Sequence, residues 1–192
     1  MNLDIRPVTV DLWPALDTLF GPQGACYGCW CSYFRLAPKQ RDALSTDEKR
    51  QLLKQATHEA LPPGLIALGD GVPVGWVQVT PRAQVPRWNT DRTVSRPLDG
   101  DDPSDPGLWA ISCFFIQSKR RGQGISHALL EAAVAHARDN GARIVEACPI
   151  LKAKQSKSVG LFVGSVSVFE KAGFECVAER KPGRPLMRKM VA

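Results

Sequence analysis

The sequence predicts a mixed α/β fold built around one core, and three observations lead to this. Hydrophobic residues make up 44% of the 192 residues and charged residues 23%, a balance typical of soluble globular domains. A charge-free run at residues 108–116 is followed by a glycine-rich turn and a long helical pattern, as in a strand-helix-strand unit. Other apolar runs with period two alternate with helical patterns, giving about seven strands and about four helices. We therefore expect a single domain over residues 1–192.

The N-terminal region predicts one strand and two helices. Residues 3–8 form a short strand, and residues 10–20 form a helix in which leucines recur at helical spacing. Ser45 and Glu48 have the spacing of a capping box and start the second helix, which stops before Pro62.

The middle of the chain predicts a hairpin, a long connection and a buried strand. Residues 65–68 and 74–79 are strands joined by a Gly-Asp-Gly turn. Residues 81–107 hold five prolines and an acidic run, so we expect a connection without regular structure. Residues 108–116 carry no charge, which indicates a strand covered on both faces.

The C-terminal region predicts the remaining elements. A helix is expected at 122–140 and a strand at 143–148, parallel to the strand at 108–116 through a right-handed crossover. A loop, a short helix at 165–172 and two strands at 174–178 and 185–191 complete the chain.

Charge and cysteine content limit the class of protein. The formal net charge is +6, a mild bias toward anionic partners such as a nucleic acid or a phosphorylated cofactor. The longest apolar run is far shorter than the ~20 residues that span a bilayer, and residues 1–11 lack the apolar segment of a signal peptide. We expect a cytoplasmic protein that does not bind membranes and whose six cysteines are reduced.

The turn at residues 119–126 carries the most specific pattern in the sequence. It reads Lys-Arg-Arg-Gly-Gln-Gly-Ile-Ser between a buried strand and a helix. Glycines let the main chain approach a ligand, and the N–H groups and dipole of a helix start attract phosphate oxygens. The chain has no Gly-x-x-x-x-Gly-Lys-Ser/Thr loop, and the turn lacks the third glycine of a dinucleotide fold. The pattern predicts a diphosphate site, and the alternative is a solvated basic turn.

This stretch resembles the acetyl-coenzyme A signature of the GNAT superfamily of N-acetyltransferases. The resemblance rests on Phe114-Phe115-Ile116, Gly122, Gly124-Ile125-Ser126 and Leu129-Leu130, and on the late Gly173-Phe174 pair. The order of elements also matches nearly the whole chain, and the Gly28-Cys29-Trp30-Cys31 motif suggests a bacterial subgroup. The resemblance implies a central mixed, mostly antiparallel sheet with a splayed parallel pair, flanked by helices.

The resemblance also implies where the co-substrate acetyl-coenzyme A binds. In that family the pantetheine arm inserts between the splayed strands like an extra strand, which here points to Phe114, Phe115 and Ile116. The diphosphate is expected on the turn, with Lys119 and Arg120 free to meet outer phosphates. The residues of the turn that carry over are Arg121, Gly122, Gln123, Gly124, Ile125 and Ser126.

Two positions depart from the family pattern. Phe162 stands where a cofactor-binding Asn is frequent, and Phe169 stands where a Tyr often protonates the departing thiolate. The usual general acid is therefore missing. A thiolate is nevertheless a stable leaving group, so the reaction needs chiefly a base for an amine whose pKa is ~10.

Glu146 is the candidate base, because it is the acidic residue inside an apolar strand at the edge of the expected cofactor cleft. The alternative is a carboxylate that faces outward or bridges the core to a Lys or Arg. Both interpretations stay open at the level of sequence.

Cys26, Cys29 and Cys31 have the close spacing of a metal-binding knuckle, but no second motif supplies further ligands. A metal site and a redox pair are alternatives to the interpretation that we prefer, in which this segment packs or lines the substrate pocket, with no metal bound. Cys29, Trp30 and Phe34 are the candidate substrate residues, and core packing is the alternative for the aromatic ones.

The sequence therefore predicts an enzyme that transfers an acetyl group directly from acetyl-coenzyme A to a primary amine of a small molecule or peptide, in a ternary complex. A coenzyme-binding sensor module without turnover is the first alternative, motivated by Phe162 and Phe169. A nucleic-acid-binding protein is the second, and the scattered basic residues disfavour it. The sequence is compatible with a homodimer and does not identify the acceptor.

Overall fold

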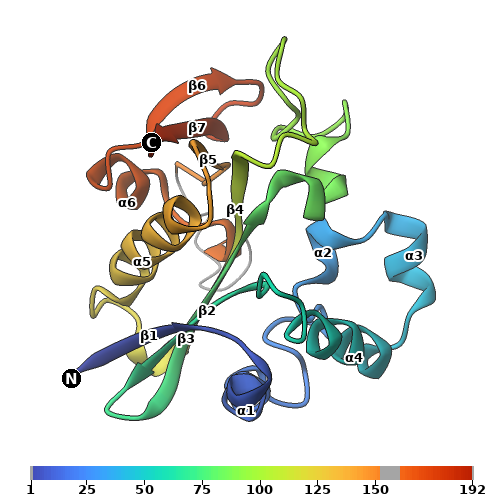
Figure 1. Cartoon of the computed structure of the whole chain (residues 1–192), viewed down its shortest axis with the longest axis vertical. Coiled ribbons are helices and arrows are strands. Elements are labelled where there is room, and N and C mark those ends of the chain that lie inside the picture. The colour runs from blue at the N-terminus through green and yellow to red at the C-terminus, as the bar shows by residue number, and fades with distance from the viewer. Residues whose placement is uncertain (1, 152–160, 192) are drawn as a thin grey trace.

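The computed structural model describes residues 2–151 and 161–191, and within them all strands join one seven-stranded sheet (Figure 1). The strands are β1 (Leu3–Pro7), β2 (Gly64–Gly69), β3 (Val72–Pro81), β4 (Leu108–Ile116), β5 (Ile144–Ala147), β6 (Glu175–Glu179) and β7 (Pro185–Met190). Their order is β1-β2-β3-β4-β5-β7-β6, and every neighbouring pair is antiparallel except β4 and β5. The predicted mixed, mostly antiparallel sheet with one parallel pair is confirmed.

The described residues contain six α-helices rather than the four expected. They are α1 (Trp13–Phe20), α2 (Ser32–Arg35), α3 (Pro38–Ala43), α4 (Thr46–Ala56), α5 (Ile125–Asp139) and α6 (Val166–Lys171). The unexpected ones, α2 and α3, have four and six residues, too few to show a helical period in the sequence. None of these helices combines the length and apolar composition that a membrane span requires.

Helix α4 starts as the capping box predicts. The hydroxyl of Ser45 accepts a hydrogen bond from the Glu48 N–H at 3.2 Å, and the Glu48 carboxylate accepts one from the Ser45 N–H at 2.7 Å. These bonds occupy N–H groups that a helix start leaves unpaired. The loop expected before α6 lies largely outside the described residues.

Helices cover both faces of the sheet. Figure 1 shows α5 and α6 on one face and α1 to α4 on the other. On the first face α5 buries Leu129, Leu130 and Ala133, and on the second α1 buries Leu16 and Phe20. Burial of such side chains removes apolar surface from water on both faces of the sheet. On the first face it holds α5 against β3.

The absence of a side chain at Gly75 on β3 allows α5 to approach the sheet closely. A Cβ atom at this position would lie 3.0 Å from Ile125 Cγ2 and from Leu129 Cδ1. The start of α5 is therefore held tightly over β3, and the turn that precedes it has a defined position.

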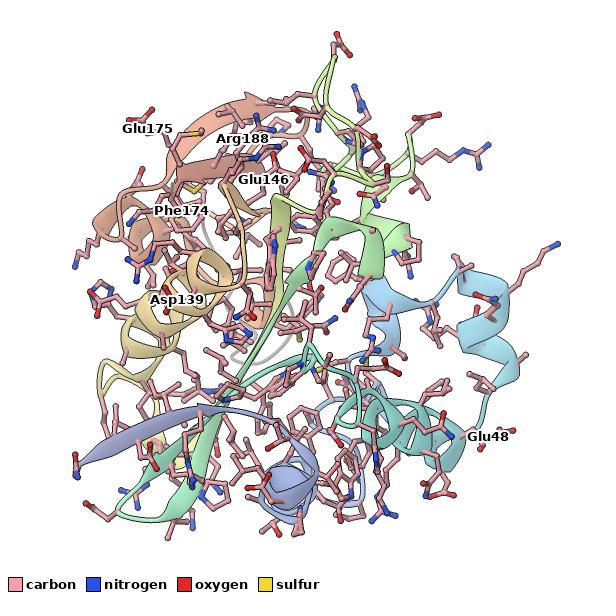
Figure 2. The ribbon with its side chains drawn as sticks, in the orientation of Figure 1. Glu48, Asp139, Glu146, Phe174, Glu175 and Arg188 are labelled. Atoms are coloured by element: carbon pink, nitrogen blue, oxygen red, sulfur yellow. The ribbon has the colours of Figure 1, made fainter. Side chains whose placement is uncertain are left out.

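A buried ion network anchors the connection between β3 and β4, which contains the 3₁₀ helices η2 (Arg82–Gln84) and η3 (Pro86–Asn89). Glu146 on β5 has no exposed surface, and its Oε1 accepts hydrogen bonds from Nε and Nη2 of Arg188 on β7 at 2.9 and 2.6 Å. Its Oε2 pairs with Arg82, which is also fully buried. Arg188 also pairs with Asp101 in the connection. Figure 2 shows Glu146 and Arg188 side by side at this end of the sheet.

The network satisfies its buried charges with several partners. Arg82 also donates through Nε to Asn89 Oδ1 at 2.7 Å and through Nη2 to the Ser95 carbonyl, and its guanidinium lies 5.3 Å from the centre of the Trp88 ring. Burial lowers the pKa of Arg82, and the adjacent Glu146 carboxylate opposes that shift. A buried charge is tolerable only with such partners, so removal of one partner costs far more than loss of a surface ion pair.

We expect the substitution Arg82→Gln to lower the free energy of unfolding by about 3–5 kcal/mol, because it leaves the Glu146 carboxylate buried with one guanidinium instead of two. Arg92→Gln, in the same connection but exposed, should change it by less than about 0.5 kcal/mol. Urea unfolding of the two variants beside the unsubstituted protein measures the difference. Equal stability of the two variants would show that the network does not hold this connection.

Candidate functional site

Strands β4 and β5 pair only over their first part and then separate. The parallel register runs from Leu108 opposite Ile144 to Ile111 opposite Ala147, where β5 ends. Strand β4 continues to Ile116 and stays paired there with β3 on its other side. Phe114, Phe115 and Ile116 therefore lie on a strand edge that β5 does not cover. The 3₁₀ helix η5 (Leu161–Val163) also packs against β4, where Val163 shares a buried cluster with Ala110.

The turn after β4 places two glycines in front of α5. Gly122 and Gly124 have φ angles of 77° and 79°, and a Cβ atom built on either would have no atom within 4 Å. Gly124 is also the residue that caps α5. The main chain is therefore open to a ligand at the point where the first N–H groups of a helix have no intrahelical acceptor.

Positive charge surrounds this turn. Lys119 and Arg120 lie on the 3₁₀ helix η4 (Ser118–Arg120), and Arg121 follows it with an exposed side chain whose Nε donates to the Ile116 carbonyl at 3.4 Å. No acidic residue occurs between Gln117 and Ser126. Open main-chain N–H groups, a helix dipole and these cations form an anion-binding arrangement.

The predicted cofactor residues fall into groups with different contacts. The Phe114 ring lies 6.0 Å from the Phe169 ring, on the face that α5 covers, whereas the Phe115 ring lies 5.6 Å from Phe20 on the opposite face. The Ile125 side chain is buried under α5, so this residue offers only its main chain to a ligand. The side chains of Gln123 and Ser126 are exposed and partly buried, respectively.

Phe169 and Phe162, which depart from the family pattern, occupy different environments. Phe169 is fully buried between Phe114 and Phe174, with ring centroids 6.0 and 5.1 Å away. Its side chain has no hydroxyl group and can donate no proton, so Phe169 acts here as an apolar core residue. Phe162 is partly buried and belongs to an aromatic cluster described below.

Glu146, the candidate base, is held by the ion network. Guanidinium groups already donate to both of its oxygens, and the side chain has no exposed surface. An amine could reach this carboxylate only if Arg82 or Arg188 moved away. The arrangement has the form of a carboxylate that bridges the core, the alternative considered from the sequence, and the role of base stays a prediction.

The candidate substrate residues separate into two clusters. Phe34 lies with Trp88 and Phe162, at ring distances of 6.1 and 6.3 Å, over Ala110 of β4 and near Cys148 that follows β5. This aromatic cluster stands at the end of the sheet where β4 and β5 are paired. Trp30 instead packs with Phe20 in the core under α1 and is 2% exposed.

The segment that carries Cys26, Cys29 and Cys31 contacts β4 through the sulfur atom of Cys31. Cys31 Sγ lies 3.9 Å from Cys113 Sγ and accepts a hydrogen bond from the Trp76 indole N–H at 3.2 Å. The contact with Cys31, and then burial, raise the pKa of the Cys113 thiol, while burial raises that of the partly buried Cys29. No group of three metal-ligating side chains occurs within residues 2–151 and 161–191.

Three buried polar residues near the point of separation escaped the sequence analysis. Gln78, Thr80 and Ser112 are at most 1% exposed, and their polar side-chain atoms have no hydrogen-bond partner among the described residues. The β3–β4 register shifts between Gln78 and Val79, opposite the stretch that contains Ser112. Bulges of this kind are frequent next to active sites. The polar positions 78 and 80 within an otherwise apolar run were the available signal.

Comparison with known proteins identifies the same fold. The model of the acetyltransferase (GNAT) family matches residues 29–174, whereas no curated protein matches the sequence. An N-acetyltransferase from Staphylococcus aureus Mu50 has a TM-score of 0.56 and 14% identity, with 100% of both chains covered. The PaiA N-acetyltransferase from Thermoplasma acidophilum, solved with coenzyme A, has a TM-score of 0.52 and 14% identity, covering 99% of each chain.

A third structure, YncA from Salmonella typhimurium with acetyl-coenzyme A, has a TM-score of 0.54 and 14% identity, covering 99% of this chain and 94% of that one. At these identities the structures show the shared fold. The family model covers well over half of the sequence, including β4, the glycine turn and α5. The chain therefore belongs to the acetyltransferase (GNAT) family.

Proposed function

We propose that this protein transfers an acetyl group from acetyl-coenzyme A to a primary amine of a small molecule or peptide, directly and in a ternary complex. The observation that carries the proposal is the open glycine turn at the start of α5, beside the uncovered edge of β4. Family membership supports acyl transfer, and the structures of relatives with coenzyme A and acetyl-coenzyme A support the co-substrate.

The turn and β4 supply complementary parts of the coenzyme site. The N–H groups and cations of residues 121–126 suit a diphosphate. The backbone of Phe114, Phe115 and Ile116 suits the amides of a pantetheine arm, because a strand edge offers N–H and C=O groups in alternation. Acetyl-coenzyme A supplies a thioester, and its thiolate is a good leaving group.

The acceptor end of the site is proposed beside the aromatic cluster of Phe34, Trp88 and Phe162. These rings form an apolar wall over β4, and the unpartnered polar atoms of Gln78 and Ser112 support a place for a polar group. Cys29, which is partly buried, remains a candidate substrate residue. Trp30 acts as core, since it is buried against α1.

In the transfer, the neutral amine nitrogen attacks the carbonyl carbon, the carbon–sulfur bond breaks, and the nitrogen loses one proton to water. Phe169 cannot protonate the leaving thiolate, which departs as the anion or takes its proton from water. Glu146 is proposed as a positioning residue that joins β5 to β7 and to the connection between β3 and β4, next to the point where β4 and β5 begin to separate. The rate should then follow the fraction of acceptor present as neutral amine.

Replacing Gly124 with Val should weaken coenzyme A binding by roughly 100-fold or more, because a branched side chain would fill the space through which a ligand reaches the main chain. Isothermal titration with coenzyme A measures this. Valine at a φ of 79° also strains the backbone, so a control with the same strain is needed.

Gly141 supplies that control, since it has a φ of 91°, lies after the other end of α5 and has equally open surroundings. Gly141→Val should lower stability about as much as Gly124→Val and leave coenzyme A affinity unchanged. If both variants bind coenzyme A as the unsubstituted protein does, the turn is not the diphosphate site.

Release of free coenzyme A thiol from acetyl-coenzyme A, measured over a panel of primary amines, tests turnover itself. Glu146→Gln should lower the rate by the same factor at all pH values and also lower the melting temperature, because it leaves Arg82 and Arg188 without a charged partner. A deficit confined to low pH that vanishes near the amine's pKa would instead identify Glu146 as the base. Coenzyme A binding without thiol release for any amine would favour the sensor module.

A further inference from the structure

A second pocket lies between α2 and α4, on the face of the sheet opposite α5. Its volume is about 590 Å³, within the range of small-molecule sites. Trp30, Ser32 and Arg35 form one wall, and Lys49, Leu52 and Leu53 form the other. Leu52 is 40% exposed, so apolar surface reaches the mouth of the pocket.

The pocket lies beside the segment that carries Cys29 and Cys31. Trp30 and Ser32 line the pocket, while Cys31 between them turns its sulfur toward Cys113 on β4, 3.9 Å away. Phe114, Phe115 and Ile116, proposed to bind the pantetheine arm, are not among the lining residues. The inference below does not depend on the proposed acetyl transfer.

Among the described residues Arg35 has no counter-ion, and burial removes part of its water. No hydrogen bond or ion pair involves its guanidinium in the part of the chain that the structure describes, and its side chain is only partly exposed. Burial lowers its pKa. A charge that has lost water without gaining a partner destabilises the fold, so this position favours any anion that can enter the pocket.

The other charges of the pocket define the anion. Lys49 also has no hydrogen bond or ion pair within the described residues, and Glu59, the acidic residue of the lining, pairs with neither cation. Two positive charges and one negative charge leave one net positive charge, which matches a monoanion. The lining also combines the polar residues Ser32 and Gln84 with the leucines Leu36, Leu52 and Leu61, so it suits an anion that carries an apolar part better than an inorganic phosphate.

We propose that this pocket binds a monocarboxylate with an apolar body, its carboxylate on Arg35 and Lys49 and its body against Leu36, Leu52 and Leu61, the leucines of the lining that keep exposed surface. A guanidinium can donate two parallel hydrogen bonds to a carboxylate, and Lys49 adds a second cation from α4. Binding removes the apolar body, and the exposed surface of Leu36, Leu52 and Leu61, from water, which is favourable.

Octanoate, its neutral analogue octanamide and inorganic phosphate are suitable probes for isothermal titration and thermal unfolding of the whole chain. Octanoate should bind and raise the melting temperature, octanamide should bind at least roughly tenfold more weakly, and phosphate should cause no shift. Equal binding of octanoate and octanamide, or a stabilisation by phosphate as large as that by octanoate, would overturn the proposal.

Two substitutions identify the residues. Arg35→Gln should weaken octanoate at least roughly tenfold, whereas Lys54→Gln, on α4 but outside the pocket, should leave its affinity unchanged. Octanoate binding to Arg35→Gln as tight as to the unsubstituted protein would remove Arg35 from the site.

Arg35→Met gives a readout that needs no ligand. It keeps the apolar stem and removes a desolvated charge without a counter-ion, so the free protein should melt at a higher temperature while octanoate no longer stabilises it. A lower melting temperature of the free variant would show that Arg35 has a structural partner in the protein, which contradicts the proposal.

Discussion

The carboxylate of Glu146 is the interaction on which this end of the molecule depends. It lies opposite Ala110, one residue before β4 and β5 stop pairing, and it joins β5 to Arg188 of β7 and to Arg82 of the long connection. Because a buried charge must keep its partners, three segments far apart in the sequence are held together at the point where the strands begin to separate. The uncovered edge of β4 follows directly from that point.

Close packing on the other side of the sheet positions the glycine turn. Gly75 lets α5 lie against β3, and Ile125 at the start of that helix is buried in the same core. Gly122 and Gly124 of the turn therefore lie between Phe114 on β4 and Ile125 on α5, both buried in the same core.

Arg82 and Arg35 are both desolvated by burial, but they differ in the partners of their guanidinium groups. Burial lowers the pKa of both, yet Arg82 lies among a carboxylate, an amide and a carbonyl, whereas Arg35 lines a pocket without a counter-ion among the described residues. The first arrangement is complete within the chain and serves the fold. For the second, we propose that an anion from outside the chain supplies the missing partner.

Local pattern by itself determined β4, the start of α4 and the turn before α5, because an uncharged run, a Ser-x-x-Glu pair and closely spaced glycines act through neighbours in the chain. The short helices α2 and α3 left no period to detect. Only the tertiary structure placed Arg82 and Arg188 on Glu146, 64 and 42 residues away, and Cys113 against Cys31. Such contacts depend on which strands become neighbours, so spacing along the sequence cannot reveal whether a buried carboxylate is free to act as a base or is already bound.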